Sequence, residues 1–321
     1  MSEKCLIIGL GQIGMAYDLN IDTSKAIYSH ARAFSLHPAF KLCGGVDFSA
    51  TQRATFESHY GAPSYPDIES AMTSEMPSVV VIALPTTLHV AAINTVLLHS
   101  TPKVILCEKP LAYNLDEARN MVAVCESVKV NLYVNYMRIS DPGVAEVKKR
   151  IESGAIALPI KGVAWYSKGF LHNGSHFFNL LEFWLGSFVN AKILDSGRLL
   201  YDQDQEPDVQ VEFERGKVVF QAAWEEAFSH YTIELLSPSG RLRYEQGGEL
   251  IAWQSTQLDP NFSGYKILQN VPEIIETGMS RYQYLVACQV ADALANKPHS
   301  LCTGQQALAT LEAMHQIINL R

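Results

Sequence analysis

The chain opens with glycines at a spacing that suits a phosphate-binding turn. Residues 9–14 read Gly-Leu-Gly-Gln-Ile-Gly, directly after the apolar run Cys5–Ile8 and before a helical pattern. Glycines there allow a tight turn and a close approach of the backbone to a pyrophosphate, while the following helix N-terminus offers N–H donors. The motif predicts a dinucleotide site that includes Gly9, Gly11, Gln12, Ile13 and Gly14.

An acidic residue ends the second apolar run. Asp47 follows Lys41–Val46, where a carboxylate accepts hydrogen bonds from adenosine ribose hydroxyls and repels a 2′-phosphate. We therefore expect NAD, with NADP less favoured. Asp47 lies 33 positions after Gly14, and the usual gap of about 20 predicts an inserted loop around residues 17–24. Arg53 could stack on the adenine or pair with Asp47, and Asp47 could instead be only a turn residue.

A lysine motif ends the fourth apolar run. Residues 107–110 read Cys-Glu-Lys-Pro. Lys109 could donate a hydrogen bond to a substrate hydroxyl and stabilise negative charge that develops on its oxygen. Crowding by other donors would favour its neutral form and let it take part in proton transfer. The same residues could also be a simple strand-exit turn. Asn135 and Arg138, just past the fifth run, are candidate substrate or cofactor contacts.

These motifs all lie where an apolar run ends. Helical patterns at Thr87–Leu98 and Leu115–Val128 separate the runs, and Asn114 is a plausible cap for the second helix. Alternating strands and helices predict a parallel sheet with right-handed crossovers, whose ligands bind beyond the carboxyl ends of the strands. The runs are Cys5–Ile8, Lys41–Val46, Val79–Leu84, Val104–Cys107 and Leu132–Val134.

After about residue 136 the pattern changes. Two pairs of alternating segments flank short polar turns and predict hairpins within an antiparallel or mixed sheet. The predicted fold is α/β, with a Rossmann NAD(P)-binding domain at 1–136 and an α+β substrate-binding and oligomerisation domain at 137–321. The hairpins are 209–213 with 218–224 and 231–236 with 241–244, and the helices are 142–153, capped by Asp141, then 173–185, 279–295 and 305–318.

Composition limits the classes of partner. The 321 residues are 48% hydrophobic and carry a net charge of −8, which argues against nucleic acid because phosphate binding needs clustered lysine and arginine. The six cysteines form no CxxC pair, which favours a reducing cytoplasm over a disulfide framework. The amino terminus has no signal-peptide pattern, and no apolar stretch reaches the roughly 20 residues of a membrane span. We expect a cytoplasmic protein without a membrane partner.

Taken together, the motifs resemble the glucose–fructose oxidoreductase, inositol dehydrogenase and rhizopine-catabolism family (Gfo/Idh/MocA) over nearly the whole chain. The resemblance implies a Rossmann domain, a second domain with an open, mostly antiparallel sheet, and homo-oligomers, dimers or tetramers, assembled through that sheet. It also implies oxidation or reduction at one carbon of a sugar, inositol or nucleotide sugar. Lys109 matches the lysine that contacts the reacting hydroxyl. The implied cofactor contacts are Leu84, Pro85, Thr86, His89 and Glu108, although His89 could equally be structural.

The second-domain motif departs from the family pattern. That pattern has Asp, Gly, His and Asp at spacings of two, two and three, whereas this chain has His172, Gly174, His176 and Asn179. The resemblance gives His176 the acid/base role, with Lys109 as its partner. His172 would line the same pocket, where it could share the proton work or hold a substrate carboxylate or phosphate. Asn173 is a further candidate substrate contact.

Other interpretations of these residues remain open. The i, i+4 spacing of His172 and His176 could suggest zinc, but the segment lacks the glutamate of zincins and a third ligand, so we expect no metal. The aromatic residues Phe177, Phe178, Phe183 and Trp184 suit core packing. Besides an active dehydrogenase, the fold could serve a nucleotide-binding regulator without turnover, or hydrolyse a glycoside through transient oxidation. The dehydrogenase requires Lys109 and His176 to converge over the nicotinamide.

Overall fold

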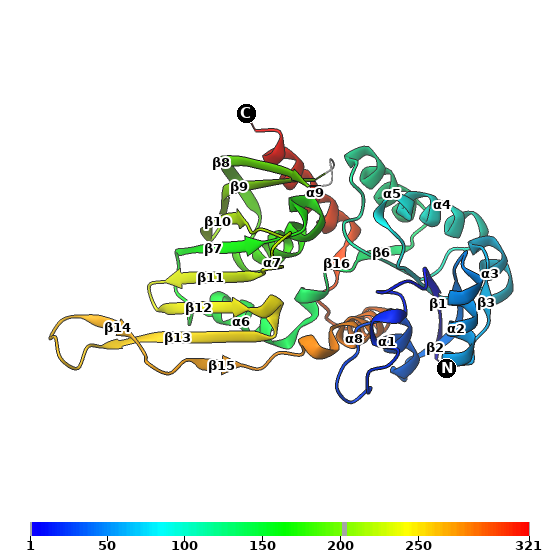
Figure 1. The fold of residues 1–321 in the computed structure, drawn as a ribbon, viewed down its shortest axis with the longest axis horizontal. Helices are drawn as coiled ribbons and strands as arrows, with labels where there is room; N and C mark the ends of the chain where they lie inside the picture. The colour runs from blue at the N-terminus through cyan, green and yellow to red at the C-terminus, as the bar shows by residue number, and fades with distance from the viewer. Residues whose placement is uncertain (1, 201–203, 321) are drawn as a thin grey trace. The chain divides into compact units, whose positions relative to one another are not determined.

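The first half of the chain alternates short apolar strands with helices, as its periodicity predicts (Figure 1). The computed structural model describes residues 2–200 and 204–320. Contacts divide the chain into unit 1, residues 1–140 with 280–309, and unit 2, residues 141–279 with 310–321. These units differ from the expected contiguous ranges because the later segment 280–309 packs back into unit 1.

Unit 1 is built on a sheet with the strand order β16-β6-β5-β4-β1-β2-β3. Its strands are parallel except β16, which is antiparallel to β6. The strands are β1 (Glu3–Ile8), β2 (Phe40–Val46), β3 (Ser64–Tyr65), β4 (Val79–Ile82), β5 (Val104–Cys107), β6 (Asn131–Val134) and β16 (Cys302–Thr303).

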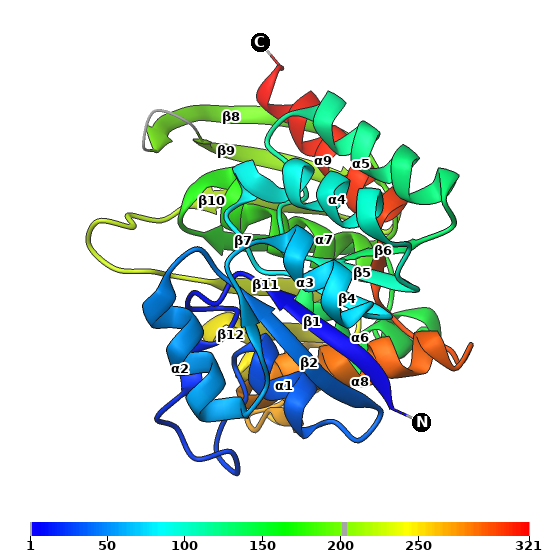
Figure 2. The same cartoon turned by 90° about the vertical axis from the view of Figure 1, so that its right-hand side faces the viewer.

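Helices cover both faces of this sheet (Figures 1 and 2). Helices α3, α4 and α5 contact one another in sequence on one face, and α1 packs against α8 on the other. The helices of unit 1 are α1 (His30–Leu36), α2 (Ala50–Tyr60), α3 (Ile68–Glu75), α4 (His89–His99), α5 (Leu115–Ser127) and α8 (Tyr282–Leu294), with short helices η1 (Ala16–Asp18), η2 (Thr86–Leu88) and η3 (Met137–Ser140).

Local chemistry explains where several helices begin. The side chain of Asn114 accepts hydrogen bonds from the N–H groups of Asp116 and Glu117, which confirms the predicted cap of α5.

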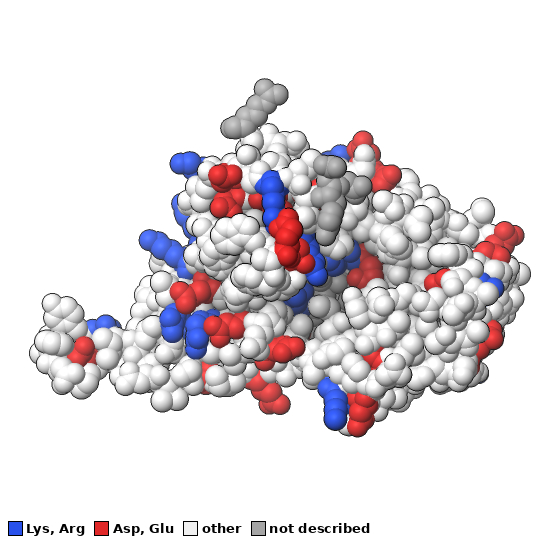
Figure 3. All heavy atoms as spheres, viewed as in Figure 1, with Lys and Arg blue, Asp and Glu red and all other residues white. Residues whose placement is uncertain are grey.

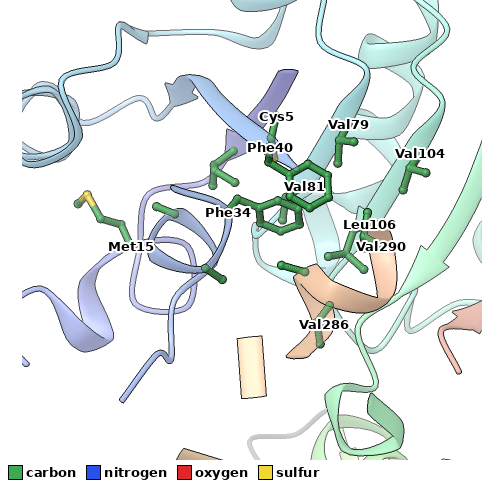
Figure 4. Close-up of a cluster of buried hydrophobic side chains, with 14 of the residues drawn as sticks. Cys5, Met15, Phe34, Phe40, Val79, Val81, Val104, Leu106, Val286 and Val290 are labelled. Atoms are coloured by element: carbon green, nitrogen blue, oxygen red, sulfur yellow. The ribbon is translucent and has the colours of Figure 1, made fainter. Parts of the chain in front are cut away.

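Between the sheet and helices α1 and α8, buried apolar side chains form a continuous core, and its labelled members are shown in Figure 4. They include Phe34 of α1 and Val286 of α8, so the return segment completes the core of unit 1. Its burial explains why 280–309 belongs to this unit.

Unit 2 contains a second sheet with the order β14-β13-β12-β11-β7-β10-β9-β8, and β15 pairs with β13. All pairings are antiparallel except β10 with β7, so the sheet is open and mostly antiparallel. The strands are β7 (Ile160–Tyr166), β8 (Phe188–Leu200), β9 (Asp204–Phe213), β10 (Gly216–Ala222), β11 (Thr232–Ser237), β12 (Gly240–Glu245), β13 (Leu250–Leu258), β14 (Lys266–Leu268) and β15 (Glu273–Ile275).

Aromatic packing fills the core between this sheet and its helices. Phe177, Phe178 and Trp184 are fully buried, as predicted for core residues, whereas the Phe183 ring centroid lies 3.9 Å from Lys148 Nζ.

The Asp141 side chain caps α6 by accepting hydrogen bonds from the N–H groups of Gly143 and Val144, which confirms the predicted cap. The helices are α6 (Pro142–Glu152), α7 (Ser175–Leu185), η4 (Gly169–Gly174), η5 (Gln246–Gly248), η6 (Met279–Arg281) and α9 (Gly304–Ile318), which begins in unit 1.

Charged side chains of both signs intermingle on the face seen in Figure 3. None of the helices within residues 2–200 and 204–320 is long and apolar enough to cross a membrane. Over the same residues, no group of three or more histidine, cysteine, aspartate and glutamate side chains could hold a metal ion.

Candidate functional site

The three glycines of the opening turn have different surroundings. A Cβ on Gly9, whose φ is +95°, would lie 2.5 Å from the Ala83 carbonyl oxygen, and a Cβ on Gly14 would lie 1.9 Å from the Gly9 oxygen. Among residues 2–200 and 204–320, a Cβ on Gly11 would meet nothing within 4 Å. Internal packing therefore requires the first and third glycines, while the space at Gly11 suits a ligand that approaches the backbone closely. The turn fits the pyrophosphate of a dinucleotide.

The helical segment after this turn is interrupted, in agreement with the inserted loop predicted around residues 17–24. The Gly11 carbonyl accepts hydrogen bonds from Met15 and Ala16, and η1 follows. The chain then leaves and returns at α1, whose first N–H groups, those of His30 and Ala31, donate to the carbonyls of Ile13 and Gly14. The predicted insertion thus lies inside the helix and explains the long spacing to Asp47.

Asp47 and Arg53 form a local network after β2. The Asp47 carboxylate accepts hydrogen bonds from the N–H groups of Leu10, at 2.9 Å, and Ser49, at 2.8 Å. Arg53 donates to the carbonyl oxygens of Asp47 and Phe48, so it pairs with the backbone of the turn rather than with the carboxylate. Each carboxylate oxygen can accept more than one hydrogen bond, so Asp47 can still receive a ribose hydroxyl.

The turn after β4 lies against the glycine turn. The Leu84 side chain comes within 3.1 Å of the position that a Gly9 Cβ would occupy, and Pro85 and Thr86 continue along this edge with Pro85 exposed. His89 is fully buried, and its ring nitrogens face the carbonyl oxygens of Leu84, at 2.9 Å, and Leu111, at 3.1 Å. This placement contradicts a direct cofactor contact by the His89 side chain, because both nitrogens face the backbone and the ring ties two turns together.

Glu108 is the centre of a buried hydrogen-bond network at the end of β5. Its Oε1 atom accepts hydrogen bonds from His30 Nε2 and Asn135 Nδ2, each at 2.7 Å. Asn135 Nδ2 also lies 3.2 Å from Gln283 Oε1. Asn135 is 3% exposed, so its amide holds neighbouring side chains, and the structure argues against the expected substrate contact. Glu108 itself is 12% exposed.

The surroundings of Glu108 favour its carboxylate form. Burial raises the pKa of the Glu108 carboxyl, but hydrogen bonds and charge from His30, the Asn135 amide and the Lys109 ammonium together lower this pKa below its ordinary value. Lys109, the next residue in the chain, is half-buried and acts on Glu108 through its charge, and Arg138 is buried in η3. Unit 1 therefore carries an ionised acid and an adjacent lysine at the carboxyl edge of its sheet.

In unit 2, two buried carboxylates hold the segment that contains His172. Asp204 accepts hydrogen bonds from the N–H groups of Leu171, at 2.9 Å, and His172, at 2.7 Å, while Glu206 accepts one from Gly169 at 2.8 Å. These bonds satisfy donors at the start of η4, a π-helix that leads into α7. Burial raises the pKa of the Asp204 carboxyl, although its backbone donors oppose this rise.

The predicted substrate residues of unit 2 lie on η4 and α7. The Asn173 amide donates to the Tyr231 hydroxyl at 3.0 Å, and His172 is half-buried. His176 is 8% exposed. At Asn179, the second departure from the family pattern, the side-chain amide lies 3.3 Å from the Thr310 hydroxyl of α9.

Several supporting residues were not predicted from sequence. His30 belongs to none of the sequence motifs, and Gln283 lies 253 positions from it, so no local pattern could join them. Asp204 and Glu206 did carry a signal, because acidic residues alternate at inward-facing positions of β9, where apolar side chains are usual. The expected convergence of Lys109 in unit 1 with His176 in unit 2 stays a prediction.

Comparison with known proteins gives the family context. The model of a family described as "Oxidoreductase family, NAD-binding Rossmann fold" (GFO_IDH_MocA) matches residues 4–136. An inositol 2-dehydrogenase from Rubrobacter xylanophilus is 26% identical over 241 residues, 71% of this chain. A D-xylose 1-dehydrogenase [NADP(+)] from Haloarcula marismortui is 30% identical over 99 residues, 31% of this chain. The matches span 66% and 27% of these relatives' own lengths.

A solved structure extends the likeness of fold to nearly the whole chain. The WlbA dehydrogenase from Bordetella pertussis, in complex with NADH and UDP-GlcNAcA, superposes with a TM-score of 0.74. The superposition covers 98% of this chain and 95% of that one at 15% sequence identity. At this identity the likeness shows the fold alone, including the second domain that lies beyond the residues matched by the family model.

Proposed function

Because the chain belongs to the Gfo/Idh/MocA family of oxidoreductases, we propose that it moves a hydride to or from a hydroxyl-bearing carbon of a sugar, polyol or nucleotide sugar. The observation that carries the proposal is the glycine turn, which is tightly packed at Gly9 and Gly14 but open at Gly11. The named substrates of its relatives, an inositol and D-xylose, support the same class.

The residues of unit 1 would hold a nicotinamide dinucleotide along one sheet edge. Gly11, Gln12 and Ile13 would meet the pyrophosphate, and Asp47 the adenosine ribose. We favour NAD over NADP because the Asp47 carboxylate would repel a 2′-phosphate. The turn of Leu84, Pro85 and Thr86 would line the same edge. When bound, the nicotinamide supplies the hydride acceptor or donor.

The polar side chains would accept the proton and stabilise the negative charge that develops on the substrate oxygen. Oxidation of an alcohol removes a hydride from carbon and a proton from oxygen. Lys109 would donate a hydrogen bond to that oxygen and stabilise its developing charge, and His176 would accept the proton, since an imidazole titrates near neutral pH. His172, Asn173 and Arg138 would orient the substrate. The proposal requires Lys109 and His176 to reach one substrate from different units.

Steady-state kinetics with variants tests these roles. The panel comprises myo-inositol, D-xylose, D-glucose and UDP-N-acetylglucosamine, each with NAD and NADP, monitored by NAD(P)H absorbance. We expect Lys109→Met and His176→Ala each to lower kcat/KM by roughly 10²- to 10⁴-fold, while the exposed-residue controls Lys41→Met and His59→Ala keep it. Unaltered turnover in both site variants would refute the assignment. Tight NADH binding without turnover would indicate a regulator, and aglycone release without net NADH a hydrolase.

The open sheet of unit 2 suits self-association. Its outward positions on neighbouring strands include Val163, Trp165, Val219 and Leu236, which share this face with charged residues. We infer a homo-oligomer, a dimer or tetramer, formed through this sheet.

A further inference from the structure

His30 is a buried histidine. Its Nε2 atom makes a hydrogen bond, whereas its Nδ1 atom makes none with the described residues. Nε2 lies 2.7 Å from Glu108 Oε1. Because a carboxylate only accepts hydrogen bonds, we assign the ring proton to this nitrogen. Nδ1 is buried without a hydrogen-bond partner among the described residues. An unpaired buried polar atom destabilises the fold, and an apolar side chain would avoid this cost. Core packing alone therefore does not explain a histidine at this position.

The inserted loop sets the position of His30. Asp18, fully buried within the insertion, accepts hydrogen bonds from the N–H groups of Tyr28 and Ser29 and from the Ser29 hydroxyl. Ser29 in turn caps α1, whose first residue is His30. Arg32 lies 3.6 Å from the same carboxylate and donates to the Ile21 carbonyl. The hydrogen bonds of Asp18 therefore fix the first turn of α1, and this turn places the His30 imidazole against Glu108.

Two other segments complete the set around Glu108. Asn135, which follows β6, donates to the same Oε1 atom, and Gln283, in the first turn of α8, accepts from the Asn135 amide. Tyr282 is adjacent on α8, and burial followed by the Glu108 charge raises the pKa of its hydroxyl. The titratable groups near Glu108 are thus His30, Lys109, Tyr282 and the buried Cys107 thiol.

We propose that His30, together with Asn135 and Gln283, is a positioning residue that fixes the Glu108 carboxylate beside Lys109 and so keeps the Lys109 amino group charged and oriented. The inference rests on the proposed function, in which that amino group contacts the reacting hydroxyl. His30 acts through Glu108 and does not touch the substrate. A shift of about 1 Å in a catalytic group can cost roughly 100-fold in rate, so such a set has a measurable kinetic effect.

Competitive labelling of the protein without cofactor tests the proposal directly. Acetic anhydride modifies neutral amines, and mass spectrometry compares Lys109 with the exposed Lys41 in the same sample. Glu108→Gln removes the carboxylate and should raise the labelling rate of Lys109 roughly three- to tenfold. His30→Asn, whose amide is too short to reach Glu108, should raise it in the same direction. His30→Gln, whose Nε2 can replace that of histidine, should restore the wild-type rate.

A matched control separates this effect from general loosening of α1. His37, at the other end of the same helix, packs against Phe40 and Tyr284 and makes no contact with Glu108. His37→Ala should leave Lys109 labelling unchanged. If His30→Asn fails to fold, Gln283→Leu perturbs the same network from α8 and should also raise the rate.

Two results would overturn the proposal: a wild-type labelling rate of Lys109 in whichever of His30→Asn and Gln283→Leu folds, or no effect of Glu108→Gln on that rate.

Turnover gives a second measurement. With the substrate found in the panel above, kcat of His30→Asn should fall roughly 10- to 100-fold while the Kd for NADH stays within about twofold, and His30→Gln should recover most of it. Because labelling needs no substrate, full activity of Lys109→Met would remove the proposed function without changing the labelling result.

Discussion

Individual glycines of the opening turn contribute separately to internal packing and to the space available for a ligand. The oxygen of Gly9 leaves no room for a side chain at Gly14, whereas none of the residues that the structure describes occupies the space beside Gly11. Stability and ligand binding should therefore respond to different substitutions within six residues.

Gly11→Ala should bind NADH at least about tenfold more weakly, because its methyl group fills the space through which the pyrophosphate approaches. Its unfolding by urea should match that of the wild type. Gly14→Ala should instead lower stability, because its Cβ would lie 1.9 Å from the Gly9 oxygen. Fluorescence titration with NADH and urea unfolding measure both effects. Wild-type affinity in Gly11→Ala would contradict the cofactor placement.

Glu182 in α7 should make stability depend on pH near neutrality. Burial raises the pKa of its carboxyl to about 7, although hydrogen bonds from the Thr310 hydroxyl and the Phe188 backbone oppose the rise. Because this pKa exceeds the ordinary 4.5, the protonated form stabilises the fold, and its contribution is complete below about pH 4.5 and lost as pH rises through 7. Glu182→Gln should remove up to roughly 3 kcal/mol of this dependence, measured by urea unfolding from pH 5 to 8. An identical pH profile in the variant would exclude this role.

At the scale of elements, the segments that contain Lys109 and His172 are held by hydrogen bonds from parts of the chain that are distant in sequence. The π-helix η4 is held by carboxylates of β9, and the end of β5 is held by α1 and α8. Gly169, with φ +82°, allows this arrangement, because a Cβ there would lie 2.1 Å from the Asp204 carboxylate.

Asp204→Asn should disturb η4, because an amide supplies one acceptor oxygen and turns its NH₂ group toward a backbone donor. We expect a loss of about 1–3 kcal/mol in unfolding free energy and a lower kcat through displacement of His172. Asp195→Ala, an exposed carboxylate on the neighbouring strand β8, is the control. Unchanged stability and kcat in Asp204→Asn would show that η4 does not depend on this contact.

At the scale of the whole molecule, each unit has its own sheet and core, and the chain returns to unit 1 after completing most of unit 2. Helix α8 therefore connects the Glu108 network to the late part of the chain. The outward face of the second sheet is the surface that the proposed oligomer would bury.

Val219→Glu should convert the oligomer to a monomer. Val219 pairs with Val163 and Gln210 at the middle of the sheet, so a buried carboxylate at the interface would lack a partner and cost several kcal/mol. Light scattering after gel filtration measures the mass, with Lys41→Glu in unit 1 as the control. A wild-type mass for Val219→Glu, or a monomeric wild type, would exclude this interface.

The sequence alone was sufficient for many features that depend on neighbours along the chain, although helices α2 and α3 were not predicted. Periodicity and caps located the strands of the parallel sheet and the starts of α5 and α6, and the glycine spacing with Asp47 and Lys109 predicted a nucleotide site and even its insertion. Tertiary structure alone revealed that the insertion interrupts a helix, that His89 and Asn135 are turned inward, and that His30, Glu108 and Gln283 meet. These contacts join residues up to 253 positions apart, and hydrogen-bonding partners at that separation are chosen by packing of the folded chain rather than by any local pattern.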